Sequence, residues 1–191
     1  MLGLLGGAFD PPHDGHVALA RAALERFPLE RLVVLVVAAP GHKPVETPAE
    51  DRLALARIAF AGLPRTKVVQ DGHAYTVDLL GDCPLLDGDD DTVFLVGADE
   101  FADFLAWRQP DEILRLVRLA VATRPGYPWE RLEPVLARLE RRDRVEFFPM
   151  PAVPASSTEI RGRLRRGEPV DGMVPGEVVR ELRRRGLYGG V

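Results

Sequence analysis

Two histidines near the amino terminus, His13 and His16, lie in a stretch rich in glycine and proline, residues 6–16 (GGAFDPPHDGH). An apolar segment precedes this stretch, and residues 17–27 after it carry apolar side chains at helical spacing. The pattern predicts a strand, a glycine turn, a loop and the first turn of a helix. Glycine lets a ligand approach the backbone, and the N–H groups that begin a helix attract phosphate. Because histidines three residues apart share one side of a turn, both imidazoles can reach one ligand. The alternative is an ordinary surface turn.

A second candidate phosphate site lies near the carboxyl terminus, in residues 156–161 (SSTEIR). Ser156 and Glu159 have the spacing of a capping box, which predicts that a helix begins here. Hydroxyls, backbone amides and a guanidinium would then point to one spot in front of the helix, which suits a polyphosphate. They come from Ser157, Thr158 and Arg161. A capping box alone is typical of any helix start. The interpretation of residues 156–161 as a phosphate site therefore depends on the presence of the opening stretch, residues 6–16.

The elements that must position these segments alternate between strands and helices. Continuous apolar runs are typical of strands buried on both faces of a parallel sheet. Strands are predicted at residues 2–5, 32–37, 67–69, 92–96, 117–123 and 145–148. Helices are predicted at residues 17–27, 50–62, 75–80, 100–107 and 129–141, and at starts near residues 110 and 156. This alternation predicts an α/β fold with a doubly wound parallel sheet, in which ligands bind beyond the carboxyl ends of the strands.

Length and composition narrow the classes of protein. At 191 residues we expect one domain, residues 1–191, with a small helical part over about residues 155–191. The net charge of −4 argues against a dedicated nucleic-acid-binding protein. The longest apolar run, residues 32–40, is too short to cross a membrane, and no secretory signal is visible. A single cysteine, Cys83, suits a reducing cytoplasm. A homo-oligomer is compatible with the sequence.

The opening stretch resembles the signature loop of the nucleotidylyltransferase superfamily, Gly-Gly-x-Phe-Asp-Pro-x-His-x-Gly-His, at every fixed position. The second segment resembles that superfamily's Ile-Ser-x-Thr-x-Ile-Arg element, with Ala155 in place of the first isoleucine. Further segments resemble nicotinate-nucleotide adenylyltransferases over nearly the whole chain. They are Pro40-x-His42-Lys43, residues 75–78 (YTVD), residues 97–99 (GAD) with Trp107, residues 124–126 (RPG), and residues 186–188 (GLY). The resemblance implies a Rossmann-like nucleotidylyltransferase fold.

By this resemblance the protein transfers the adenylyl group of ATP to nicotinate mononucleotide by direct in-line attack. His16 would contact the α-phosphate in the transition state, His13 would assist, and Arg161 would help to hold the phosphates that leave. The full set of implied ATP-binding residues is Gly7, Ala8, Phe9, His13, His16, Gly97, Asp99, Ser157, Thr158 and Arg161. Mg²⁺ would arrive with ATP, and we expect no metal site of the protein's own, because no usual ligand set is completed near the histidines. Ala8 stands where the family often has a hydroxyl.

The reaction itself needs no general base. The second pKa of a phosphate monoester is about 6, so the attacking phosphate is already largely ionised at pH 7. What the reaction requires is positive, donor-rich groups that align two anions and stabilise the developing charge. Histidines, arginine, Lys43 and two helix starts meet that requirement.

The other substrate would be bound by Lys43, Tyr75, Thr76, Trp107 and Arg124, again by resemblance. The amides of Tyr75 and Thr76, at the positive end of a helix, would receive the nicotinate carboxylate. Trp107 would stack on the pyridine ring. Three of these residues also have a plain structural interpretation. Trp107 could be a core aromatic, and Tyr75 and Thr76 could simply begin a helix.

Three alternatives remain at this stage. The acceptor could be nicotinamide mononucleotide or phosphopantetheine, although the latter fits the YTVD segment poorly. From a different class, the chain could be an inactive nucleotide-binding regulator on the same fold. The retained histidines and Arg161 argue against a regulator, because such a protein has no need of groups that act in a transition state.

Overall fold

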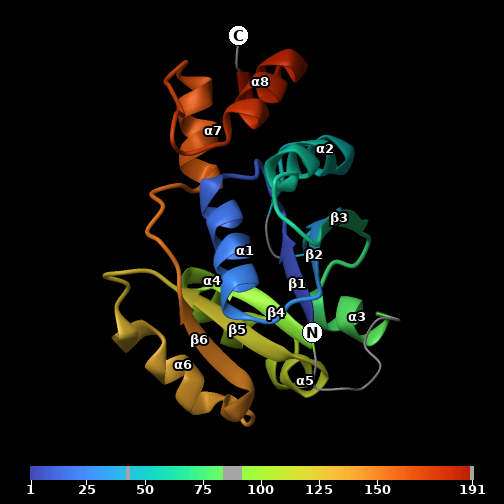
Figure 1. The fold of residues 1–191 in the computed structure, drawn as a ribbon, viewed down its shortest axis with the longest axis vertical. Helices are drawn as coiled ribbons and strands as arrows, with labels where there is room; N and C mark the ends of the chain where they lie inside the picture. The colour runs from blue at the N-terminus through green and yellow to red at the C-terminus, as the bar shows by residue number, and fades with distance from the viewer. Residues whose placement is uncertain (42–43, 84–91, 190–191) are drawn as a thin grey trace.

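The computed structural model describes residues 1–41, 44–83 and 92–189. Within these ranges the strands form one sheet in the order β3-β2-β1-β4-β5-β6, and every neighbouring pair is parallel (Figure 1). The strands are β1 (Leu2–Gly7), β2 (Arg31–Val37), β3 (Thr66–Asp71), β4 (Thr92–Gly97), β5 (Arg118–Thr123) and β6 (Val145–Pro149). The chain winds outward from β1 to β3, then from β4 to β6 on the other side. The predicted doubly wound parallel sheet is confirmed, and its direction of winding changes between β1 and β4.

Alternate residues of the strands face two separate cores, one on each side of the sheet. In β1, for example, Leu4 belongs to one core and Leu5 to the other. The Leu5 side is covered by α1 (Asp14–Arg26), α2 (Ala49–Phe60), α7 (Ser157–Arg165) and α8 (Gly176–Arg185). The Leu4 side is covered by α3 (Thr76–Gly81), α4 (Ala98–Ala102), α5 (Pro110–Leu116) and α6 (Glu133–Arg138). Burial on both faces explains why the strands are uninterrupted apolar runs.

Two predicted helices are wrong because each is divided into shorter elements. Residues 129–141 form a short 3-10 turn, Trp129–Arg131, followed by α6, because Pro134 has no backbone N–H and is tolerated only in the first turn of a helix. Residues 100–107 form the end of α4 and a separate 3-10 turn, Phe104–Ala106. Further 3-10 turns lie at Arg142–Arg144 and Leu187–Gly189. The predicted apolar stripe of residues 129–141 is nevertheless buried at Leu132, Val135 and Leu139.

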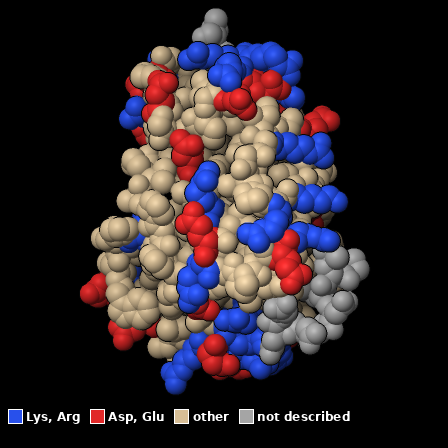
Figure 2. Space-filling model, viewed as in Figure 1, with Lys and Arg blue, Asp and Glu red and all other residues tan. Residues whose placement is uncertain are grey.

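The two candidate phosphate segments meet at one end of the molecule. In Figure 1, α7 and α8 lie at the top, beside the beginning of α1, although they are far from it in sequence. The N–H of Asp14, the first residue of α1, donates to the carbonyl of Met173 at 2.9 Å. Basic side chains gather over this end, with acidic ones among them (Figure 2). No helix in the described ranges is both long and apolar enough to span a bilayer.

Candidate active site

The two histidines of the opening stretch stack on each other at the beginning of α1. His13 is the N-cap residue and His16 lies in the first turn. Their ring centroids are 3.7 Å apart, with 24° between the ring planes. The backbone N–H of His13 donates to Nδ1 of His16 at 3.2 Å. The helix therefore begins earlier than the apolar pattern predicts, and both imidazoles lie at its start, as their spacing predicts.

The hydrogen bond between the two residues fixes the tautomer of neutral His16. Since Nδ1 accepts, the proton of the neutral ring is on Nε2, at the opposite side of the imidazole. In this tautomer His16 carries its N–H donor at Nε2.

His13 is neutral at pH 7. Only 8% of its surface is exposed, and burial lowers its pKa from 6.5 to about 4, against a smaller opposing effect of the Asp99 carboxylate. Its Nδ1 atom is buried and has no hydrogen-bond partner within the described part of the chain. A buried polar atom without a partner is costly, so this atom is a candidate ligand contact.

Small residues and one phenylalanine shape the space around the rings. A Cβ on Gly15 would lie 3.0 Å from the His13 ring, so a larger residue there would displace the imidazole. Phe9 has a φ of 50°, and its ring meets His16 edge-on at 4.9 Å on one side and Phe60 at 5.6 Å on the other. The predicted ATP-binding residues Phe9 and His16 are therefore in contact.

Asp99 reaches the same place from the other half of the sheet. It is the second residue of α4, directly after β4, and its charge acts on His13. A Cβ on Gly97 would lie 2.6 Å from Oδ1 of Asp99, so glycine is required for this side-chain position. The carboxyl ends of β1 and β4 thus bring together residues that are more than eighty positions apart, at the point where the sheet changes direction.

The opening loop is held in place by a buried network that sequence reasoning missed. Arg52 of α2 has no exposed surface and donates to the carbonyls of Ala8, Val37, Ala38 and Thr47 at 2.7–2.9 Å. These carbonyls belong to the last residue of β2 and to the loops that follow β1 and β2. A polar residue in the first turn of a predicted helix gives no sign that it is buried, so only the fold reveals this role.

Asp10 is the second part of that network. Its carboxylate is 3% exposed; Oδ2 accepts the N–H of Glu46 at 2.7 Å, and Oδ1 accepts the hydroxyl of Tyr188. Burial and this carboxylate raise the pKa of Tyr188 well above its usual range. The carboxyl-terminal GLY segment therefore anchors the opening loop.

The predicted start of α7 is confirmed. Ser156 is the N-cap, and its Oγ accepts the N–H of Glu159 at 3.2 Å. The Glu159 side chain pairs with Arg163 at 2.7 Å. Ser157 donates its hydroxyl proton to the carbonyl of Pro11 at 2.9 Å, so it ties α7 to the opening loop. The Ser157 hydroxyl therefore binds the opening loop, whereas the sequence pattern predicted that it would point toward a ligand.

Arg161 of α7 also contacts the opening loop. Nη1 donates to the carbonyl of Asp10 at 2.7 Å, Nε donates to the Glu46 carboxylate at 2.9 Å, and Nη2 lies 3.4 Å from Oγ1 of Thr158. Glu46 pairs in addition with Arg165, one turn later on the same helix. The two predicted phosphate segments are therefore one structural unit.

The residues predicted for the second substrate are distributed over neighbouring loops. Lys43, with His42, lies outside the described residues. Tyr75 is the N-cap of α3 and Thr76 its first residue. The Arg108 guanidinium lies over the Tyr75 ring, 5.0 Å from its centroid, and pairs with Asp78 at 2.9 Å. Sequence reasoning did not single out Arg108, which adds a positive group beside Tyr75.

Trp107 and Arg124 have contacts that agree with a structural role. Trp107 is half-buried and packs against Phe104 and Phe94, with ring centroids 5.3 and 6.4 Å away. Arg124 is exposed, with its guanidinium 5.7 Å from the Tyr127 ring centroid. Substrate binding by these two residues stays a prediction.

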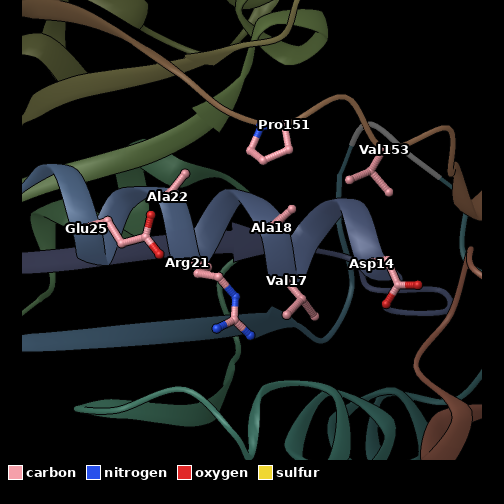
Figure 3. A pocket seen from close by; sticks show the side chains of 8 residues that line it. All are labelled: Asp14, Val17, Ala18, Arg21, Ala22, Glu25, Pro151 and Val153. Atoms are coloured by element: carbon pink, nitrogen blue, oxygen red, sulfur yellow. The ribbon is translucent and has the colours of Figure 1, made fainter.

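A shallow, largely apolar groove runs along α1, from Asp14 at its first residue to Glu25 near its end (Figure 3). Its volume is about 320 Å³, and it is lined by Asp14, Val17, Ala18, Arg21, Ala22, Glu25, Pro151 and Val153. The segment that leads from β6 to α7 forms its other wall. Near the Asp14 end, the carbonyl of Ala155 lies 3.8 Å from where a Cβ on Gly15 would be. The Asp14 end of the groove is thus close in sequence to the start of α1, and the residues before α7 lie near it. Among the described residues, no three His, Cys, Asp or Glu side chains are grouped to hold a metal.

Several known proteins are similar to this chain. The cytidylyltransferase-like family model matches residues 4–163. A probable nicotinate-nucleotide adenylyltransferase of Bordetella avium is 39% identical over 98% of this chain and 97% of its own length. The Thermus thermophilus protein of that name is 38% identical over 98% of both chains. The nicotinic acid mononucleotide adenylyltransferase of Plasmodium falciparum, solved with NaAD, has a TM-score of 0.78 at 16% identity and covers 100% of this chain and 98% of its own.

Proposed function

Since the chain belongs to the nicotinate-nucleotide adenylyltransferase family of cytidylyltransferase-like proteins, we propose that it transfers the adenylyl group of ATP to nicotinate mononucleotide. The products are nicotinate adenine dinucleotide (deamido-NAD) and pyrophosphate. The phosphate of the mononucleotide attacks the α-phosphorus of ATP in line, and no covalent enzyme intermediate forms. This reaction belongs to NAD biosynthesis.

The observation that carries the proposal is the attachment of α7 to the opening loop beside the stacked histidines. Ser157 and Arg161 donate to the carbonyls of Pro11 and Asp10, so the starts of α1 and α7 are held together. Two helix starts and a guanidinium provide N–H donors and positive charge for a triphosphate. The site contains the groups that align and neutralise two anions, which is what this reaction needs.

The histidines act on the phosphates as hydrogen-bond donors. Nε2–H of His16 donates to a nonbridging oxygen of the α-phosphate, where negative charge grows during the reaction. The unpaired Nδ1 of His13 becomes a second contact if the ligand-bound tautomer carries its proton there. The neutral state of His13 follows from its burial, and a neutral imidazole has one N–H donor and one acceptor nitrogen.

The groove along α1 suits the adenine base of ATP. A flat, largely apolar base gains from the apolar walls formed by Val17, Ala18 and Val153. Because the groove begins at Asp14, a base in it places the attached phosphates at the starts of α1 and α7. Asp99 and Gly97, at the end of β4, are our proposal for the ribose contact. Mg²⁺ enters with ATP, bound to its phosphates, as it commonly does.

The nicotinate end of the acceptor lies, in this proposal, at Tyr75 and Thr76. The N–H groups there receive the carboxylate, and Arg108 beside Tyr75 adds a positive charge that Asp78 partly neutralises. Lys43 neutralises the attacking phosphate, Trp107 stacks on the pyridine ring, and Arg124 contacts the nucleotide. Apart from Arg108, which the structure places beside Tyr75, these assignments rest on the family resemblance of the segments that contain them.

The test is to supply ATP with either nicotinate mononucleotide or nicotinamide mononucleotide and to measure pyrophosphate release and dinucleotide formation. We expect turnover with both, and a higher kcat/KM for the acid. A higher kcat/KM for the amide would assign the protein to the amide substrate instead. Absence of pyrophosphate release with either acceptor, while ATP still binds, would favour the inactive regulator.

A further inference from the structure

Two arginines of α7 are paired with one carboxylate of the protein itself. Glu46 lies in the loop between β2 and α2, and its carboxylate bridges two arginines one turn apart on α7. Oε1 accepts from Nε of Arg161 at 2.9 Å, and Oε2 pairs with Arg165. A carboxylate held between two guanidiniums occupies the kind of site that a phosphate group fills.

The loop that carries Glu46 is fixed by its backbone, and its side chain is not. The N–H of Glu46 donates to buried Asp10, and the carbonyl of the next residue, Thr47, accepts from buried Arg52. The Glu46 side chain, by contrast, is 41% exposed, and that of Arg165 is 52% exposed. The carboxylate can therefore rotate away into water while the loop stays in place.

Arg161 keeps its position without Glu46. Only 17% of its side chain is exposed, and Nη1 donates to the carbonyl of Asp10 at 2.7 Å. A ligand that replaced the carboxylate would thus find one guanidinium already oriented and a second within one turn of the same helix.

We propose that Arg161 and Arg165 bind the terminal phosphates of ATP, and also pyrophosphate, and that Glu46 is an internal counter-ion that the polyphosphate displaces. The inference rests on the proposed function, because it takes a triphosphate as substrate. It adds Arg165 to the site and gives Glu46 a competitive role. Neither residue is part of the signature segments.

The physical argument is one of competing anions. An exposed carboxylate–arginine pair contributes little to stability, because water and salt screen it. A polyphosphate brings several negative charges and can bind both guanidiniums with paired hydrogen bonds. Hydrogen bonding to Arg165 lowers the pKa of Glu46, so the carboxylate stays ionised at neutral pH and competes there. Removing its charge should tighten polyphosphate binding about fivefold, the upper range for one such pair.

The experiment compares Glu46→Gln and Arg165→Gln with two matched controls from the same helix end. Glu168 pairs with Arg166 through two hydrogen bonds, at 2.7 and 2.9 Å, and this pair does not involve Glu46. The controls are therefore Glu168→Gln and Arg166→Gln. For each protein we would measure the Kd of inorganic pyrophosphate by calorimetry, and kcat and the KM for both substrates by pyrophosphate release.

For Glu46→Gln we expect the pyrophosphate Kd and the KM for ATP to fall about fivefold, with the KM for the mononucleotide within twofold of wild type. Arg165→Gln should raise the pyrophosphate Kd severalfold, and both controls should match wild type. An unchanged or weakened pyrophosphate affinity in Glu46→Gln would overturn the proposal, as would equal effects in Glu168→Gln. Failure of the wild-type protein to transfer adenylyl groups would instead overturn the proposed function, and the calorimetry does not depend on that activity.

Discussion

Replacement of His13 by asparagine should make the stability of the protein less sensitive to acid. The folded pKa of His13, about 4, lies below the unfolded value of 6.5 because the ring is buried. The unfolded chain therefore takes up this proton first as the pH falls. The stabilising effect of a neutral His13 is complete above pH 6.5 and is lost as the pH falls toward 4.

The size of the effect follows from the two pKa values. Relative to neutral pH, the linkage relation gives a loss of about 2 kcal/mol at pH 5 and about 3 kcal/mol at pH 4. His13 is 8% exposed, so screening by water reduces this only modestly. In His13→Asn that share of the acid sensitivity disappears, whatever the substitution does to stability at pH 7.

The assay is urea unfolding followed by circular dichroism at pH 7.5, 6, 5 and 4.5, for wild type, His13→Asn and His73→Asn. His73 is the control because its pKa is shifted the other way, raised by hydrogen bonds to Asp71 and then Asp82. Its stabilising effect is present below pH 6.5 and is lost as the pH rises through the folded pKa. As the pH falls, the free energy of unfolding should therefore decrease less steeply than in wild type for His13→Asn, and more steeply for His73→Asn. Identical slopes for wild type and His13→Asn would refute the neutral, buried state of His13.

Three further predictions concern the site and its support. His16→Ala should lower kcat roughly 10²–10³-fold, the loss expected for one transition-state donor; a change confined to KM in steady-state assays would mean that His16 only binds substrate. Arg52→Met should destabilise the fold by about 3–5 kcal/mol in urea unfolding, because buried carbonyls lose their donor, and an effect below 1 kcal/mol would contradict the buried network. Ala18→Trp should fill the groove along α1 and raise the KM for ATP about tenfold or more, since an apolar contact worth more than 1.4 kcal/mol is lost; an unchanged KM would place the base elsewhere.

The sheet was predictable because each strand is marked by a run of apolar residues that are consecutive in the sequence. Runs such as residues 32–37 and 92–96 have to be buried on both faces, and that burial is visible in the residue types alone. Helix ends were less predictable. Pro134 shortens α6, and the sequence pattern of residues 129–141 hides this, because the apolar stripe continues through the break.

The site was predictable as a set of residues but not as a set of contacts. The spacing of His13 and His16 indicated that both imidazoles share one turn, and the structure stacks them. Nothing in the spacing indicated that Ser157 would bond to Pro11, because the partner is 146 residues away. Burial and long-range pairing depend on the whole fold, and a local pattern does not contain them.

The sequence by itself determined the class of chemistry: a glycine turn with two histidines and a second helix start that carries an arginine. Only the tertiary structure decided the protonation state of His13 and brought a carboxylate to Arg161. His13 is neutral because the folded chain buries its ring, and Arg161 is occupied because the loop after β2 brings Glu46 to it. Both outcomes are set by desolvation and by charges that are distant in sequence, and these become definite only when the elements pack.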